Sequence, residues 1–259
     1  MIKFFTKEFY KDKRNVLWAA VFGVSLAACL ASLLMLILHL APDEENLSEF
    51  KQNVSSVPEI VLGDNPIDFV SLQGETPDVC AWIRIPDTVI DYPILQSGET
   101  RDEDFYLDHD RNGKSKKAGS IYIQKLNSKD ISDRNTVIYG HNMLNGTMFA
   151  QLKKYRNREF FNNHRDIYVY TPGHILHYKV LSAFVYDDRH ILNSFNFYDD
   201  EDYAMFLDDC IYPSSLARQV CDDITPATTD KIITLSTCTN VDTERYLVVG
   251  VLQSDTPTK

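Results

Sequence analysis

The sequence lacks the features that mark several classes of protein. It has 259 residues with 26 basic and 37 acidic side chains, for a net charge of −11. No extended basic run follows Arg14, and nucleic-acid binding depends on neutralising phosphates, so we expect no nucleic-acid partner. The chain also has no internal repeat with a period of 20–50 residues and no low-complexity tract, which argues against repeat and disordered proteins.

Cysteine is scarce and scattered. The chain holds five cysteines, which are too few for a disulfide scaffold and include no CxxC pair of the kind that binds zinc: Cys29, Cys80, Cys210, Cys221 and Cys238. We therefore expect no metal site and no cofactor. A bridge between Cys210 and Cys221 stays an open alternative to reduced core thiols.

Charge is missing altogether from one long stretch. Residues 16–41 contain no Asp, Glu, Lys or Arg over 26 positions. As a helix, such a run is about 39 Å long, against about 30 Å of hydrocarbon in a bilayer. The pattern predicts a transmembrane anchor. A cleaved signal peptide is the alternative, but the run exceeds the 7–15 residues usual for a signal peptide.

The charges on either side of this stretch predict its orientation. Residues 1–41 hold 5 basic and 2 acidic side chains, which leaves 21 basic and 35 acidic ones, or −14, in the remainder. The positive-inside rule then predicts a cytoplasmic tail at 1–15, a single span at 16–41 and an extracellular remainder. An acidic exported domain is also expected to attract basic amines.

The exported part begins with a polar segment. A weak helical pattern through Leu47, Phe50 and Val54 predicts a stalk, and a second short helix is expected near Pro66 to Leu72. We assign residues 42–75 to this helical stalk and residues 76–259 to one catalytic domain, since no linker divides them.

The remainder alternates short apolar runs with turns rich in Pro, Gly, Asn and Asp. Eight runs are rich in β-branched and aromatic residues, as strands are: 81–85, 88–95, 119–124, 135–140, 166–170, 174–186, 231–236 and 245–252. Such close spacing with few helices predicts a mainly β protein with a closed or nearly closed antiparallel barrel.

Two segments between these runs are predicted to be helical. In Thr147–Tyr155, Thr147 is expected to cap a helix whose inner face carries Met148, Leu152 and Tyr155. In Phe197–Tyr212, Asp199 or Asp200 is expected to cap a helix that buries four residues, Tyr203, Phe206, Leu207 and Cys210.

Cys238 has the setting of a nucleophile. Alternation in residues 232–238 places it at a strand end on the same face as Ser236, and the following turn returns Arg245 beside it. A nearby guanidinium favours a thiolate and can stabilise an oxyanion. The alternative is a buried structural thiol next to a solvated arginine.

His141 is the best candidate base among the seven histidines. It follows a predicted strand through Gly140, so its ring can project into a cleft at a strand end. A single histidine is more often structural than catalytic, and the pairing of a strand-end His with a strand-end Cys and Arg favours the catalytic interpretation.

These residues resemble a known family. Thr234–Cys238, the later Arg245 and the earlier Tyr139–Asn142 are similar to the active site of a sortase, a cell-wall transpeptidase of Gram-positive bacteria. Class B sortases in particular are similar to this chain in residues 82–96, 105–124 and 146–155 and in the helical insertion. Gln124 stands where that class often has an acidic residue, and no role is assigned to it.

The resemblance implies a fold and a reaction. The fold is a closed eight-stranded sortase-type barrel with N-terminal helices and a helical insertion before the cysteine strand. The reaction is cleavage of a sorting signal after Thr through a thioester on Cys238, with Arg245 stabilising the oxyanion, His141 as acid and base, and Ser236 lining the substrate groove. The implied partners are surface proteins with a C-terminal sorting signal and a peptidoglycan amine.

Two other functions remain open at this stage. A surface cysteine protease would also use Cys and His but would only hydrolyse, and papain-like proteases place Cys before His, whereas His141 precedes Cys238. A non-catalytic, anchored binding domain on the same scaffold is the other alternative.

Overall fold

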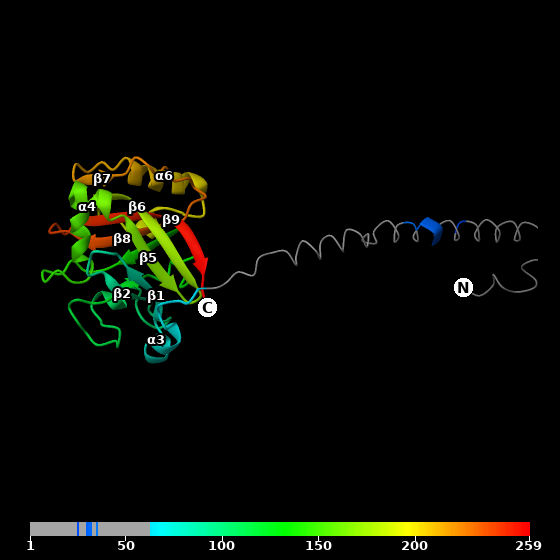
Figure 1. Cartoon of the computed structure of the whole chain (residues 1–259), viewed down its shortest axis with the longest axis horizontal. Helices are drawn as coiled ribbons and strands as arrows, with labels where there is room; N and C mark the ends of the chain where they lie inside the picture. The colour runs from blue at the N-terminus through cyan, green and yellow to red at the C-terminus, as the bar shows by residue number, and fades with distance from the viewer. Residues whose placement is uncertain (1–24, 26–29, 33–34, 36–62) are drawn as a thin grey trace, which may run out of the picture. The chain divides into compact units, whose positions relative to one another are not determined.

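The eight apolar runs form eight strands of one barrel. The computed structural model describes residues 25, 30–32, 35 and 63–259 (Figure 1). The eight strands are β1 (Val79–Arg84), β2 (Asp91–Leu95), β3 (Ile121–Ile123), β4 (Asn135–Tyr139), β5 (Asp166–Thr171), β6 (His174–Asp187), β8 (Ile232–Cys238) and β9 (Glu244–Pro257).

The strands close on themselves. Their order is β5-β1-β2-β3-β4-β8-β9-β6, and an additional pairing of β5 with β6 completes the ring. The predicted closed eight-stranded barrel is therefore confirmed. Two neighbouring pairs, β2 with β3 and β4 with β8, are parallel, so the barrel is not wholly antiparallel as expected. A ninth strand that the sequence analysis missed, β7 (Arg218–Val220), pairs with the edge of β6.

The barrel interior is packed with apolar side chains. Alternation along β8 directs Ile233 and Leu235 inward, where both are fully buried in one cluster with Ile138 of β4 and Val248 of β9. The opposite face of β8 carries Thr234, Ser236 and Cys238. The predicted alternation of this strand thus places the candidate nucleophile on the outer face of the barrel.

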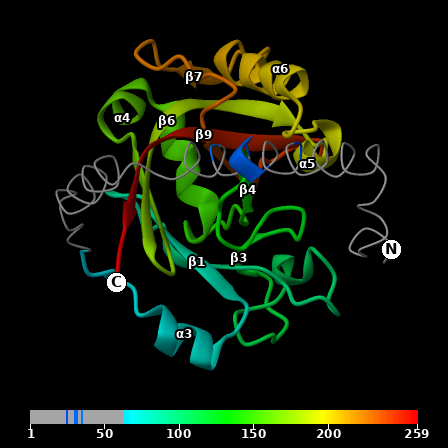
Figure 2. The ribbon, with the colours of Figure 1, turned by 90° about the vertical axis from the view of Figure 1, so that its right-hand side faces the viewer.

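The insertion between β6 and β8 covers part of that outer face. Its helices are α5 (Ile191–Ser194) and α6 (Asp200–Ile211). As predicted, Asp199 caps α6, accepting hydrogen bonds from the backbone N–H groups of Glu201 and Asp202. The four predicted residues of α6 are buried, and they join a second apolar cluster that includes outer-face residues of β4, β8 and β9. In Figure 1 and Figure 2, α6 lies along the outer side of β6 and β9.

The other predicted long helix differs from its expectation. Residues Phe149–Arg156 form a 3-10 helix, η3, which is followed by α4 (Arg158–Asn163). Met148, in a left-handed conformation with φ 56°, precedes η3 without a side-chain cap. Thr147 does not cap, because Asn145 Oδ1 accepts hydrogen bonds from both its backbone N–H and its hydroxyl. Met148, Leu152 and Tyr155 are buried, as predicted.

The short helix before the barrel begins later than expected. Helix α3 (Phe69–Glu75) starts after Asp68, whose carboxylate accepts a hydrogen bond from the backbone N–H of Ser71. Phe69 is buried, whereas Val70 is exposed. One further 3-10 helix, η2 (Phe105–Leu107), lies in the long connection from β2 to β3.

The predicted tail at 1–15 and almost all of the span predicted at 16–41 lie outside the described residues, as does most of the stalk at 42–75. Among the residues described, no helix is long and apolar enough to cross a membrane. The proposed domain boundaries therefore stay predictions.

Candidate active site

Cys238 is the only exposed thiol in the described part of the chain. It is the last residue of β8, and the six residues before it in the strand are buried. Cys80, Cys210 and Cys221 are free thiols, so the bridge between Cys210 and Cys221 does not form. Burial raises the pKa of Cys80 to about 12 and raises the pKa values of Cys210 and Cys221 as well. These three thiols are poor nucleophiles near neutral pH.

Arg245 lies directly opposite Cys238. The antiparallel pairing of β8 with β9 makes the two residues register partners at the turn end of the hairpin. The Nη1 group of Arg245 donates hydrogen bonds to the carbonyl oxygens of Asp242 (2.9 Å) and Glu244 (3.0 Å) in the turn. A guanidinium has five N–H donors, so these two bonds fix the group while leaving others for a ligand.

His141 reaches the same end of the barrel through a parallel pairing. Tyr139 of β4 is the register partner of Ser236 of β8, and the backbone N–H of Gly140 donates to the Ser236 carbonyl. His141 comes two residues after Tyr139, and Cys238 comes two residues after Ser236. Because the two strands run in parallel, both side chains lie at the same end of the barrel. The ring Nε2 of His141 lies 2.7 Å from the carbonyl oxygen of Leu107.

Gly140 makes this approach possible. A Cβ atom at this position would run into the side chains of Ile121 and Phe149, both of which are buried in the barrel core. The Gly-His pair seen in the sequence therefore has a physical basis, because only glycine fits between these two side chains.

A hollow of about 220 Å³ collects the four predicted site residues. Cys238, His141, Arg245 and Ser236 all line it, and we call it the Ser236 hollow. Ser236 is only 4% exposed, so it forms part of the floor. The structure thus brings together every residue that the sequence analysis selected.

The Ser236 hollow also contains a polar cluster that the sequence analysis missed. Asp104 Oδ1 accepts hydrogen bonds from the Tyr122 hydroxyl (2.9 Å) and from Gln124 Nε2 (2.8 Å). Burial, reinforced by the Asp104 carboxylate, raises the pKa of Tyr122, and burial likewise raises the pKa of Tyr139. Both phenols therefore stay neutral. No local sequence signal points to this cluster, since its members come from a loop and a separate strand.

A second hollow meets the first at Cys238 and His141. It has a volume of about 310 Å³, and its lining includes Lys153 and Arg156 of η3. We call it the Arg156 hollow. Arg245 and Ser236 do not line it, so Cys238 and His141 stand between two spaces of different composition.

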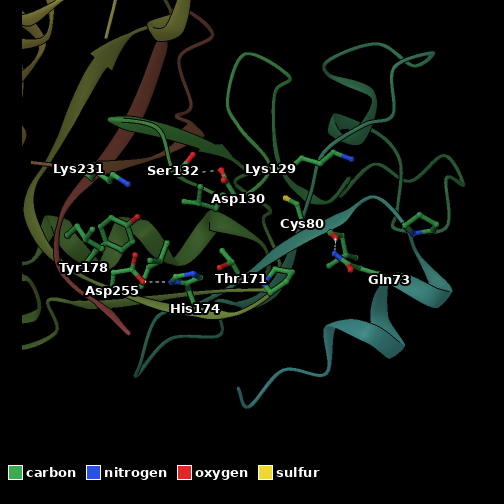
Figure 3. A pocket seen from close by; sticks show the side chains of 16 residues that line it. Gln73, Cys80, Lys129, Asp130, Ser132, Thr171, His174, Tyr178, Lys231 and Asp255 are labelled. Carbon is green, nitrogen blue, oxygen red and sulfur yellow. Dashed lines mark hydrogen bonds and ion pairs between the residues drawn. The ribbon is translucent and has the colours of Figure 1, made fainter. Parts of the chain in front are cut away.

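A larger hollow lies elsewhere in the described part of the chain. It measures about 690 Å³ and is lined by Cys80, Lys129, His174, Lys231 and Asp255 among others (Figure 3). Lys231 precedes β8 and Cys238 ends it, so the two places are roughly 20 Å apart along an extended strand. With its only thiol buried, this hollow is a weaker candidate for catalysis. In the described part of the chain, no group of three His, Cys, Asp or Glu side chains is placed to hold a metal.

Comparison with known proteins agrees with this geometry. Residues 83–253 match the model of the sortase domain. The chain is 36% identical to sortase B of Listeria monocytogenes over 204 residues, which are 77% of this chain and 78% of the relative. It is 31% identical to sortase B of Staphylococcus aureus over 185 residues, covering 70% and 73%. The crystal structure of Clostridium perfringens sortase B aligns with a TM-score of 0.64 at 32% identity, covering 71% of this chain and 99% of that one.

Proposed function

This chain belongs to the sortase family, with class B relatives, and we propose that it cleaves a sorting signal after Thr through a thioester on Cys238 and transfers the acyl group to a cell-wall amine. Membership makes it a cysteine transpeptidase of the cell-wall sorting type. The observation that carries the detailed proposal is the convergence of an exposed Cys238 with His141 and Arg245 in one hollow.

In the first half of the reaction, the Cys238 thiolate attacks the backbone carbonyl carbon of the threonine in the sorting signal. Charge develops on the carbonyl oxygen, and the N–H groups of Arg245 that do not serve the turn stabilise it. His141 gives a proton to the departing amine nitrogen as the C–N bond breaks. The product is a thioester on Cys238 and a released C-terminal peptide.

In the second half, a cell-wall amine replaces the enzyme. The amine nitrogen attacks the thioester carbon, its proton passes to His141, and the C–S bond breaks to regenerate the thiolate. One peptide bond is exchanged for another, so the reaction needs no nucleoside triphosphate as an energy source. This suits an enzyme that works outside the cytoplasm.

The polar setting of the Ser236 hollow supports a peptide substrate. Ser236 and the Asp104 cluster line it together with apolar side chains such as Leu107 and Ile191. A groove of this mixed character is typical of sites that bind an extended peptide through both backbone and side chains. We therefore assign Ser236 to substrate binding.

We also propose that residues 16–41 anchor the enzyme in the cell membrane with its N-terminus in the cytoplasm. The uncharged stretch and the excess of basic residues before it support this arrangement. The catalytic domain would then face the cell wall, where both substrates are found.

Product analysis tests the proposal. The full chain in detergent micelles is incubated with a library of threonine-containing peptides, with and without an added amine, and the products are read by mass spectrometry. We expect peptide ligated to the amine, and hydrolysis alone would indicate a protease instead. Cys238→Ala should abolish both products, whereas Cys221→Ala, which removes a half-buried thiol, should retain them.

A further inference from the structure

Cys238 and His141 line two hollows, and the proposed reaction involves two substrates. We propose that the Arg156 hollow binds the incoming amine, and that Lys153 and Arg156 select acceptors that carry a carboxylate on the same molecule as that amine. This inference rests on the proposed transpeptidase function, and it adds the position and the chemical class of the second substrate.

The positions of the reacting groups assign the two hollows. The acyl carbonyl must reach both Cys238 and Arg245, and only the Ser236 hollow is lined by both. The acyl chain therefore occupies that side. The amine must reach the thioester carbon and give its proton to His141, and the Arg156 hollow is lined by His141 and Cys238 without Arg245. An amine bound there approaches from the side that the acyl chain leaves free.

The charge of the Arg156 hollow differs from that of the chain as a whole. Lys153 and Arg156 line it, and its lining among the described residues contains no Asp or Glu. The Ser236 hollow, in contrast, includes Asp104, Asp187 and Asp188. In a chain with a net charge of −11, a space bordered by two cations and no carboxylate is suited to an anionic group.

Both cations belong to η3, and the fold holds Arg156 in place. The guanidinium carbon of Arg156 lies 5.0 Å from the centre of the Tyr246 ring, which also lines the hollow. Burial raises the pKa of Tyr246, so this ring stays neutral and does not cancel the charge of Arg156. Stacking on an aromatic face restricts a guanidinium to a few orientations.

This charge pattern identifies the acceptor's chemistry. The attacking amine has to be neutral, so it gains nothing from nearby cations. A carboxylate on the same small molecule or peptide would pair with Lys153 or Arg156 and hold the amine near the thioester. The transfer step itself is unchanged: a C–N bond forms, the C–S bond breaks, and the amine proton goes to His141.

A competition between two acceptors tests this inference. The full chain in detergent micelles is loaded with a sorting-signal peptide and offered equal amounts of triglycine, which has a free carboxylate, and triglycinamide, which does not. Because both acceptors compete for the same thioester, the ratio of the two products does not depend on the rate of acylation. We expect triglycine to be favoured by about twofold to fivefold at low salt, as for other exposed charge pairs. The ratio should fall as salt screens the charges.

Variants with matched controls identify the residues. The double variant Lys153→Gln, Arg156→Gln should bring the product ratio close to one, and Arg156→Lys should keep most of the preference. Lys154→Gln is the control, since Lys154 lies on the same helix but bonds to the Asp87 carbonyl and does not line the hollow. If the double variant unfolds, Lys153→Gln alone should still lower the ratio.

The outcomes separate the two proposals. Ligated products with no preference for triglycine in the unmodified chain would overturn this inference while leaving the transpeptidase function intact. A preference that survives both Gln substitutions would overturn the assignment to Lys153 and Arg156. Failure of the unmodified chain to form any acyl-enzyme would overturn the proposed function and this inference with it.

Discussion

His141 and Leu107 are far apart in the sequence, yet the ring Nε2 of His141 lies 2.7 Å from the backbone carbonyl oxygen of Leu107. A carbonyl oxygen can only accept a hydrogen bond, so Nε2 carries a proton and donates it. In the neutral ring, Nδ1 is then the nitrogen with a free lone pair. In the proposed mechanism, the Leu107 carbonyl is therefore a positioning group, because it leaves Nδ1 of His141 as the nitrogen that would exchange protons with the substrates.

The position of the Leu107 carbonyl depends on Gly119. This glycine has φ +54°, and a Cβ atom there would collide with the backbone of Tyr106 and Leu107. We predict that Gly119→Ala displaces the Leu107 carbonyl and lowers kcat/KM for peptide cleavage by about tenfold or more, as small displacements of catalytic groups do. Steady-state cleavage of a fluorogenic sorting peptide measures this effect.

Gly113→Ala is the matched control for that substitution. Gly113 lies in the same connection with φ +73°, but its Cβ would meet only side-chain atoms at 3.7 Å and beyond. The left-handed backbone should cost each variant about 1–2 kcal/mol of unfolding free energy. The backbone collision should add to this loss in Gly119→Ala. Only Gly119→Ala should also lose activity, and equal activity losses in the two variants would contradict the role of the Leu107 carbonyl.

Gly140→Ala tests the close packing beneath His141. The added methyl group would press on Ile121 and Phe149, and overpacking of this kind destabilises a core by about 1–3 kcal/mol. Urea unfolding measures this loss. The control is Gly74→Ala in α3, where nothing lies within 4 Å of the new Cβ. That helical substitution should stabilise the protein by about 0.5–1 kcal/mol. A loss of stability in Gly74→Ala would show that the loss in Gly140→Ala does not report on close packing.

The sequence predicts the barrel better than it predicts the details of the site. Alternating β-branched and aromatic runs are a strong signal, because each strand must bury one face, and all eight runs became barrel strands. Strand β7 has only three residues, none of them buried, so its pairing with β6 has no apolar pattern to reveal it. Thr147 fits the rule for a helix cap, but its hydroxyl donates a hydrogen bond to Asn145 Oδ1 and does not cap the helix.

The site residues divide in the same way. Cys238, His141 and Arg245 stand at strand ends, and strand ends can be placed from the sequence once the strands are known. The Leu107 carbonyl is a backbone atom and has no residue signature. Asp104 and Gln124 come together only because η2 folds back against β3. Contacts of this kind depend on loop geometry, which a single sequence specifies poorly.

Cys80 makes stability depend on pH in the alkaline range. Its pKa is raised from 9.0 to about 12 in the folded protein because burial disfavours the thiolate. The folded state therefore holds the proton where the unfolded state releases it, and the contribution of the neutral thiol is complete below pH 9 and falls as the pH rises toward 12. We predict that Cys80→Ala flattens the decline of unfolding free energy above pH 9. Buried tyrosines will keep part of the slope.

The control for this pH dependence is Ser182→Ala, which removes a buried hydroxyl that does not ionise in this pH range. It should leave the alkaline slope unchanged. Urea unfolding at a series of pH values between 8 and 11 compares the two variants with the unmodified chain. Identical slopes in Cys80→Ala and the unmodified chain would contradict this prediction. They would show that folding does not raise the pKa of Cys80.

Arg245→Lys tests whether the oxyanion needs a guanidinium or only a positive charge. In the folded protein, Nη1 of Arg245 already serves the carbonyls of Asp242 and Glu244, so its remaining N–H groups are the ones available to substrate. A lysine ammonium would have to choose between the turn and the substrate, because its donors share one nitrogen. We predict that Arg245→Lys lowers kcat by about 10²–10³, the usual cost of losing an oxyanion donor.

Arg189→Lys is the control for this substitution. Arg189 lines the same hollow but is paired with Asp187 at 2.6 Å, so Arg189→Lys should retain activity within a few fold. Pre-steady-state cleavage assays measure both variants. Rates near that of the unmodified chain in Arg245→Lys would favour a simple charge effect over directed hydrogen bonding.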